Sequence, residues 1–141
     1  MKKRVGIIIL VLLLLILAGG GAAFYYYYSK YINIDAIYPG MTIQGMSVGG
    51  MTREEAKAKV QEYVDKVSQE TVTLQVKKKE STFALSDIGL KCTNMDVVEK
   101  AYDFGKTGNV FKRVIEVRKL EKEGMDFPLT FSVDKAETRK I

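Results

Sequence analysis

The feature that most constrains this chain is its N-terminal apolar segment, twenty residues without a charge at positions 5–24. A helix of that length spans about 30 Å, the thickness of the hydrocarbon core of a bilayer. Such a helix also satisfies its backbone hydrogen bonds internally, as a segment in lipid must. Four tyrosines follow at positions 25–28, and amphipathic rings favour the membrane–water interface. The pattern predicts a helix that crosses a membrane once.

The basic residues before this segment predict its orientation. Lys2, Lys3 and Arg4 favour the cytoplasmic side, so the chain after residue 24 is expected outside the cytoplasm of a single-pass cell-membrane protein. The alternative is a cleaved secretory signal with its cleavage site at residues 21–23, although the apolar run exceeds the roughly seven to fifteen residues typical of signals. We therefore interpret residues 1–28 as basic flank, membrane helix and aromatic belt, and residues 29–36 as a stem.

Composition excludes several classes of function. Without residues 2–4 the chain has 19 basic and 17 acidic residues, a balance that does not indicate a nucleic-acid partner. Cys92 is the only cysteine and there is no histidine, so an intrachain disulfide, the common zinc sites and Ser–His or Cys–His pairs are excluded. We expect no metal, no cofactor and no catalytic residue. No pattern indicates an oligomeric state.

The clearest helix signal lies after residue 51. Thr52 and Glu55 have the spacing of a capping box, and a run of apolar residues then falls on one helical face: Ala56, Val60, Tyr63, Val64 and Val67. Before this helix, residues 43–48 are typical of a short strand interrupted at Gly45. Residues 71–77 and 82–85 alternate polar and apolar, which predicts a half-buried hairpin with a turn at 77–81 and with Phe83 inward.

The second half of the chain continues this alternation of helices and strands. A helix capped near Asn94 is expected to end at Gly105, and another to occupy residues 110–120. Residues 127–133 alternate and read as one strand, in which Pro128 indicates either the start of the strand or an edge position. The predicted fold is therefore α+β, a small and mostly antiparallel sheet packed with two or three helices. Asp134 and Glu137 then read as another capping box, so residues 134–141 are interpreted as the start of a truncated following segment, or else as a frayed tail.

Three segments resemble those of a known family. Residues 37–56 read I-Y-P-G-M-T-I-Q-G-M-S-V-G-G-M-T-R-E-E-A, residues 85–90 read L-S-D-I-G-L, and residues 101–109 read A-Y-D-F-G-K-T-G-N. In this order and spacing they are similar to the YoaR-like peptidoglycan-binding domain, over residues 37–133. Lys106 stands where the family has an arginine, which keeps the charge but loses the planar fork of the guanidinium.

The resemblance implies a non-catalytic module that binds peptidoglycan at the bacterial cell wall. Such modules commonly precede an L,D-transpeptidase or VanW-like domain, and one alternative is that this chain is the anchor and spacer of a cell-wall enzyme with its catalytic domain elsewhere. Another is an envelope protein-interaction module. The cysteine and histidine motif of the transpeptidase is absent from the sequence. Cys92 is interpreted as a buried or half-buried structural residue.

The loop at residues 105–109 is the candidate ligand-binding site. Lys106, Thr107 and Asn109 are its candidate residues, with Lys106 placed to meet a carboxylate and Asn109 an amide. The alternative is a helix-terminating turn in which Asn109 caps the next helix. The tyrosines at 25–28 are interpreted as an interfacial belt rather than a sugar platform, and the lysines at 77–79 as a solvated turn rather than a contact for anionic polymer. Pro39-Gly40 and Gly49-Gly50 are read as turns rather than a phosphate cradle.

Overall fold

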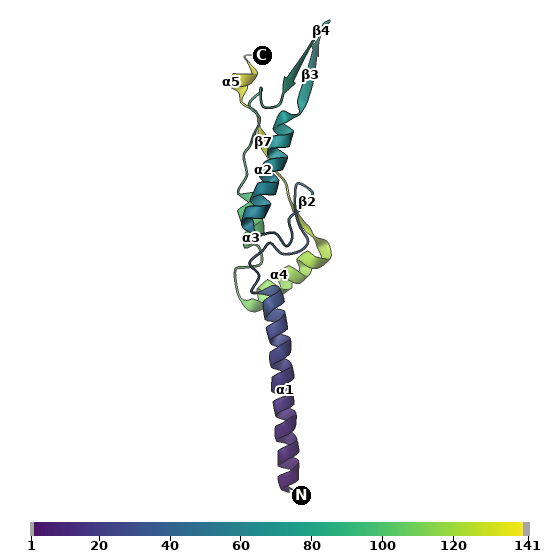
Figure 1. Cartoon of the computed structure of the whole chain (residues 1–141), viewed down its shortest axis with the longest axis vertical. Coiled ribbons are helices and arrows are strands. Elements are labelled where there is room, and N and C mark those ends of the chain that lie inside the picture. The colour runs from purple at the N-terminus through teal and green to yellow at the C-terminus, as the bar shows by residue number, and fades with distance from the viewer. Residues whose placement is uncertain (1, 140–141) are drawn as a thin grey trace.

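The computed structural model describes residues 2–139 and shows an elongated molecule (Figure 1). A long helix, α1, forms a stalk, the other elements gather beyond its C-terminal end, and the hairpin β3–β4 projects at the far end near α5. The bounds are α1 Lys2–Tyr31, β1 Met41–Ile43, β2 Met46–Ser47, α2 Arg53–Gln69, β3 Thr71–Val76, β4 Lys79–Ala84, β5 Lys91–Cys92, α3 Val97–Asp103, α4 Val110–Glu123, β6 Met125–Phe127, β7 Phe131–Ser132 and α5 Lys135–Thr138. This α+β architecture confirms the predicted fold class. Residues 140 and 141 of the predicted C-terminal segment lie outside the described part of the chain.

The helix α1 is apolar on all sides. Its large side chains from Val5 to Leu17 are exposed, and it runs unbroken through the glycines at 19–21. A helix that is apolar all round requires an apolar environment. By length and composition alone, Arg4–Tyr31 can cross a membrane, a criterion that a secretory signal also meets.

The strand predicted at 43–48, with its interruption at Gly45, is instead two strands, because the chain reverses at Gln44 and Gly45. Both residues have positive φ, 49° and 74°, as in the two-residue turn that joins tight hairpins. β1 and β2 are therefore two antiparallel strands, and β1 also pairs in parallel with β6, giving the order β2-β1-β6. Asp126 on β6 accepts hydrogen bonds from the Thr42 hydroxyl (2.5 Å) and from Gly45 N–H (2.9 Å), which lower its pKa and pin the turn to β6.

The predicted strand at 127–133 is also corrected, because it divides between two sheets. β6 ends at Phe127, and β7 begins at Phe131 in a separate antiparallel pair with β5. Pro128 has no N–H to offer a ladder, and the next two N–H groups are bound by side chains: Leu129 donates to Gln44 (2.9 Å) and Thr130 to Asn94 (2.7 Å). Asn94 is therefore not the predicted cap. α3 begins after Asp96, which makes no side-chain capping bond.

The helix α2 confirms its predicted start and face. Glu55 N–H donates to Thr52 Oγ1 (3.3 Å) and Thr52 N–H to Glu55 Oε2 (2.9 Å), so the capping box is complete. Ala56, Val60 and Val64 are buried. The periodicity of the sequence thus gives the correct inward face.

The hairpin β3–β4 forms as predicted but differs in turn and burial. Its turn is only two residues, because Val76 pairs with Lys79. On β3, Val72 and Leu74 are 41% and 52% exposed, so the expectation that this strand is half-buried is wrong. On β4, Phe83 is half-buried. The hairpin projects away from the core (Figure 1), which accounts for the exposure of Val72 and Leu74.

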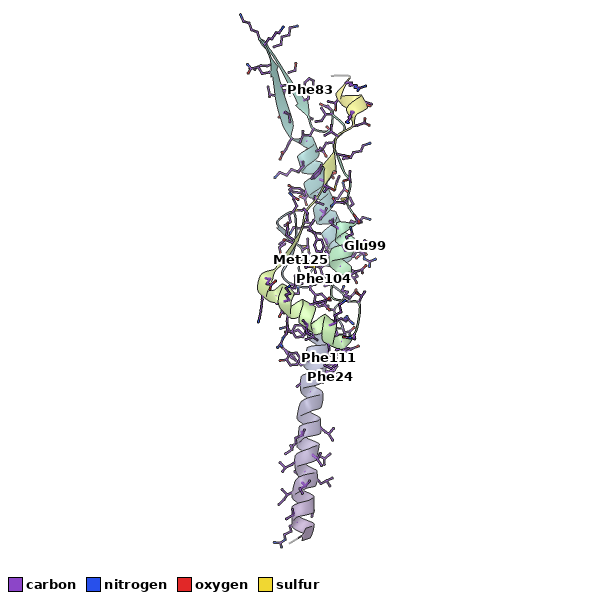
Figure 2. The ribbon with its side chains drawn as sticks, turned by 180° about the vertical axis from the view of Figure 1, so that it is seen from behind. Phe24, Phe83, Glu99, Phe104, Phe111 and Met125 are labelled. Carbon is purple, nitrogen blue, oxygen red and sulfur yellow. The ribbon has the colours of Figure 1, made fainter. Side chains whose placement is uncertain are left out.

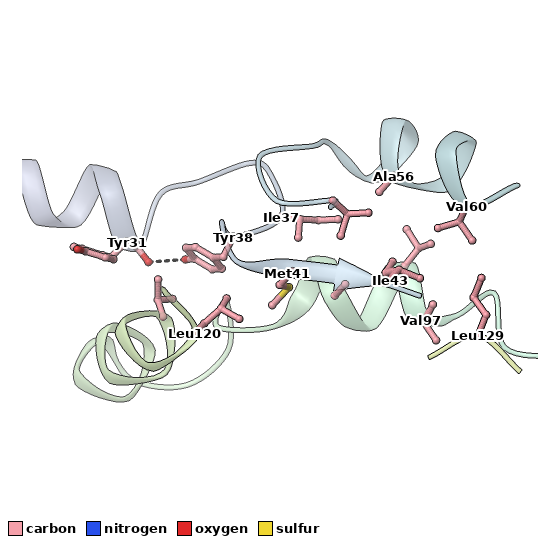
Figure 3. Close-up of a cluster of buried hydrophobic side chains, with 14 of the residues drawn as sticks. Tyr31, Ile37, Tyr38, Met41, Ile43, Ala56, Val60, Val97, Leu120 and Leu129 are labelled. Atoms are coloured by element: carbon pink, nitrogen blue, oxygen red, sulfur yellow. Dashed lines mark hydrogen bonds between the residues drawn. The ribbon is translucent and has the colours of Figure 1, made fainter. Parts of the chain in front are cut away.

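One core joins the remaining elements. Figure 3 shows β1 with α2 on one side and α3 and α4 on the other. Ile37, Tyr38, Met41 and Ile43, which lead into and form β1, are fully buried. Tyr38 Oη donates to the carbonyl of Tyr31 at the end of α1 (2.5 Å; Figure 3). The core is thereby connected to the stalk.

We expect Gly40→Ala to destabilise the domain more than Gly45→Ala does. Both glycines have positive φ, 90° and 74°, where an alanine costs about 1–2 kcal/mol. A Cβ at Gly40 would also lie 2.9 Å from the backbone oxygen of Leu120, whereas one at Gly45 meets nothing within 4 Å. The measurement is thermal unfolding of the full chain in detergent micelles, followed by the near-ultraviolet circular dichroism of its tyrosines. An equal loss of thermal stability in the two variants would show that the contact between Gly40 and the backbone of Leu120 in α4 is not tight.

Candidate functional site

The predicted loop residues have different surroundings. Asn109 is the N-cap of α4, because its Oδ1 accepts from Lys112 N–H (2.8 Å). Gly105 has φ 69° and ends the turn after α3, where a Cβ would crowd Val117 and Tyr38. Thr107 is exposed. Lys106 alone of the three candidates joins a cluster of charged and aromatic side chains.

Lys106 lies over the ring of Tyr102. Its Nζ is 3.2 Å from the ring centroid and is buried, and no group of residues 2–139 forms a hydrogen bond with it. A lysine ammonium has three N–H donors and is strongly hydrated in water, so this position leaves the π face as its main stabilising contact. Burial lowers the pKa of Lys106, while the carboxylates of Asp35 and Asp103 act in the opposite direction.

Arg53, the first residue of α2, approaches the same ring. Its Cζ lies 4.4 Å from the Tyr102 centroid, and its Nε is 3.0 Å from Glu99 Oε2, an ion pair between α2 and α3 without hydrogen-bond alignment. The Tyr102 hydroxyl donates to Asp35, and this bond raises the pKa of Tyr102. We call Asp35, Arg53, Glu99, Tyr102 and Lys106 the Tyr102 cluster.

A polar cavity of about 260 Å³ opens beside this cluster, lined by Asp35, Thr52, Arg53, Glu54 and Tyr102. Two carboxylates and a guanidinium face one space, so the cavity can meet ligand groups of either charge. Carboxylates accept hydrogen bonds from ammonium or amide groups, and a guanidinium donates to carboxylates. This chemistry suits a ligand that carries amide and ionised groups together.

Of this cluster, only Lys106 is predicted from the sequence as a site residue. Asp35 falls within the predicted stem at 29–36, and Arg53, Glu99 and Tyr102 are not among the predicted site residues. Tyr102 and Lys106 are close in the sequence, but α3 ends at Asp103, so their contact does not follow from helical spacing. Asp35 and Arg53 come from separate segments, and only the folded chain brings them together.

Cys92 is half-buried, as expected, and lies outside this cluster. Its Sγ donates to Asn94 Oδ1 (3.6 Å), and its side chain packs against the core. Asn94 also donates to the carbonyl of Pro128 (2.9 Å). The thiol therefore belongs to the contacts that fix β5 against the chain around Thr130.

The C-terminal part of the chain resembles a known family. A family model described as "Putative peptidoglycan binding domain" matches residues 81–141. The match includes the segments at 85–90 and 101–109, and therefore Tyr102 and Lys106, while the segment at 37–56 lies outside it. No curated protein and no solved structure matches the chain. Residues 81–141 are thus similar in sequence to the family that this description names.

We expect the Lys106 ammonium to titrate below the ordinary value for lysine, because its Nζ is buried. Asp35→Asn removes a charge that favours the ammonium and should lower this pKa further. Arg53→Gln removes a repelling charge and should raise it. The measurement is an NMR titration of the full chain with carbon-13 in the lysine ε positions, the Lys106 signal being assigned by Lys106→Arg. An ordinary pKa, or shifts of the same sign in both variants, would contradict this arrangement.

Proposed function

We propose that this chain is a membrane-anchored, extracytoplasmic module of the YoaR-like type that binds peptidoglycan and has no catalytic role of its own. The observation that carries the proposal is the peptidoglycan-binding family match at residues 81–141, which contains the Lys106 loop. The resemblance of residues 37–56 supports the same assignment for the first part of the domain.

The topology supports the location. Residues 2–4 are basic and precede a helix long and apolar enough to cross a membrane. Basic residues stay on the cytoplasmic side, so the domain beyond α1 would face the cell wall. A cell-wall polymer is then a ligand that the domain can reach.

The Tyr102 cluster supplies suitable chemistry for such a polymer. Peptidoglycan carries amides, carboxylates and, in its peptides, ammonium groups. Lys106 would bind a carboxylate of the polymer, and the exposed Thr107 would bind one of its polar groups. Asn109 would bind an amide through its Nδ2, because its Oδ1 already caps α4. Asp35 and Glu54 would receive a cationic group in the cavity.

The unpaired Nζ of Lys106 makes it well suited to this role. Its contact with the Tyr102 ring contributes about 0.5–2 kcal/mol, and a hydrogen bond to a charged partner contributes about 1.5–3 kcal/mol. A carboxylate that reaches Lys106 would add a charge-assisted hydrogen bond to the contact with the ring. Within residues 2–139 no group supplies such a bond to Nζ.

We expect the full chain in detergent micelles to sediment with isolated peptidoglycan. The control is an unrelated membrane-anchored domain of similar net charge, because basic proteins bind anionic wall polymers non-specifically. The measurement is the fraction of protein in the pellet at increasing amounts of peptidoglycan. Recovery no greater than that of the control would contradict the proposal and favour the interaction-module alternative.

Within that assay, Lys106→Met should weaken binding by roughly tenfold, because a lost charged hydrogen bond of about 1.5 kcal/mol corresponds to that factor. The matched control is Lys78→Met, which removes the same charge from the exposed hairpin turn. If both variants bind as the unchanged chain does, the ligand lies elsewhere on the domain. If both weaken equally, net charge rather than the Tyr102 cluster determines binding.

A further inference from the structure

The helix α4 crosses the outer end of α1 (Figures 1 and 2). Arg113 Nη2 donates to the carbonyl of Ile32 just after α1 (2.8 Å), and Glu121 accepts from the Tyr31 hydroxyl (3.5 Å) and pairs with Lys30 (3.8 Å). Val117 and Leu120 face the core and are buried. α4 is thereby fixed across the stalk rather than along it.

The side of α4 nearest the end of α1 carries exposed apolar residues. Phe111 is 82% exposed, Ile115 67% and Val110 42%, and Figure 2 shows Phe111 on the stalk side of α4 close to Phe24. We call Val110, Phe111 and Ile115 the outer face of α4. This face and the end of α1 enclose an apolar groove of about 250 Å³, lined by Phe24, Tyr27, Tyr28, Ile32, Val110, Phe111, Val114 and Ile115.

The groove lies at the level where α1 would leave the membrane. Phe24 is the last residue of the apolar segment at 5–24, and Tyr27 and Tyr28 belong to the aromatic belt. Residues at this level lie at the boundary between acyl chains and headgroups. The outer face of α4 is therefore continuous with the surface that lipid would cover on α1.

Two basic residues of α4 lie in line with its outer face. Arg118 and Lys122 continue the helical stripe of Phe111 and Ile115, at intervals of three and four residues. α4 slopes away from the stalk toward its C-terminal end (Figures 1 and 2), and Arg118 and Lys122 belong to its C-terminal half. Within residues 2–139 neither forms an ion pair, whereas Lys112 and Lys119 pair with glutamates of α4.

We propose that α4 is a second membrane-binding element, which lies on the outer leaflet with its outer face inserted at the acyl–headgroup boundary and with Arg118 and Lys122 on lipid phosphates. The inference rests on the proposed anchoring by α1. A helix with an apolar face and basic residues beside it binds an anionic membrane surface in this way. Lipid is the occupant because α1 forms one wall of the groove, and lipid already surrounds α1 at that depth.

The test uses single tryptophans, because the chain has none of its own. Phe111→Trp and Ile115→Trp place a probe on highly exposed positions, so the fold is undisturbed. Leu14→Trp reports on α1 in the membrane, and Leu74→Trp, 52% exposed on the distant hairpin, is the matched control. The full chain is placed in lipid nanodiscs that contain phosphatidylglycerol, with or without bromine on the acyl chains, and tryptophan fluorescence is compared.

We expect the bromine to quench Leu14→Trp, Phe111→Trp and Ile115→Trp and to leave Leu74→Trp unchanged. Quenching of Leu14→Trp without quenching at positions 111 and 115 would overturn the inference and leave the α1 anchor standing. No quenching of Leu14→Trp would overturn the anchor itself, and the inference with it. A blue-shifted but unquenched emission at 111 and 115 would also overturn the inference, since protein, such as a second copy of this chain, would then cover the face.

Discussion

The arrangement of the whole molecule depends on the buried hydroxyl of Tyr38 and the carbonyl that it binds. Tyr38 is completely buried beside α4, and its hydroxyl donates to the carbonyl of Tyr31 (2.5 Å). Burial raises the pKa of Tyr38, so the hydroxyl keeps its proton and remains a donor. Inside a core, a donor without its acceptor would carry the full cost of desolvation. The domain is therefore held at a fixed position on the end of α1.

Arg113 extends this junction to the candidate site. Its Nε donates to the carbonyl of Gly105 (2.9 Å) and its Nη2 to the carbonyl of Ile32 (2.8 Å). One planar guanidinium, with its fixed directions of donation, thus joins the end of α1, the helix α4 and the residue before Lys106. A lysine could not make both bonds from one nitrogen with the same geometry. The orientation of α4 and the position of the Lys106 loop consequently have a common cause.

The parts of this structure that could be predicted from sequence depend on neighbouring residues. The capping box of Thr52 and Glu55, the termination of α3 shortly before Gly105 and the pairing of β3 with β4 each involve groups close together in the chain. The parts that were missed depend on distant groups. The parallel pairing of β1 with β6 joins residues more than eighty positions apart, and Asn94 binds the backbone at Thr130 instead of capping a helix. Neither pairing leaves a periodic signal.

The candidate site follows the same division. Lys106 could be selected because a charged residue between two glycines in a loop is conspicuous in sequence. Its partner Tyr102 has the spacing of a core residue and is in fact half-buried, with its ring available to two cations. Asp35 and Arg53 enter the cluster only because the chain returns from α1 to the start of α2. Their convergence is a property of the tertiary fold.

The short segment between α1 and the cluster sets the height of the site. Asp35 comes four residues after the end of α1, and four extended residues span no more than about 14 Å. A ligand held by Asp35 and its neighbours would therefore lie close to the membrane surface, near α4, whereas the hairpin with its exposed Val72 and Leu74 extends to the opposite end (Figure 1). With α1 as the anchor, the domain would recognise glycan strands of peptidoglycan that lie next to the bilayer. The exposed apolar residues of the hairpin would then lie on the side of the domain far from the bilayer.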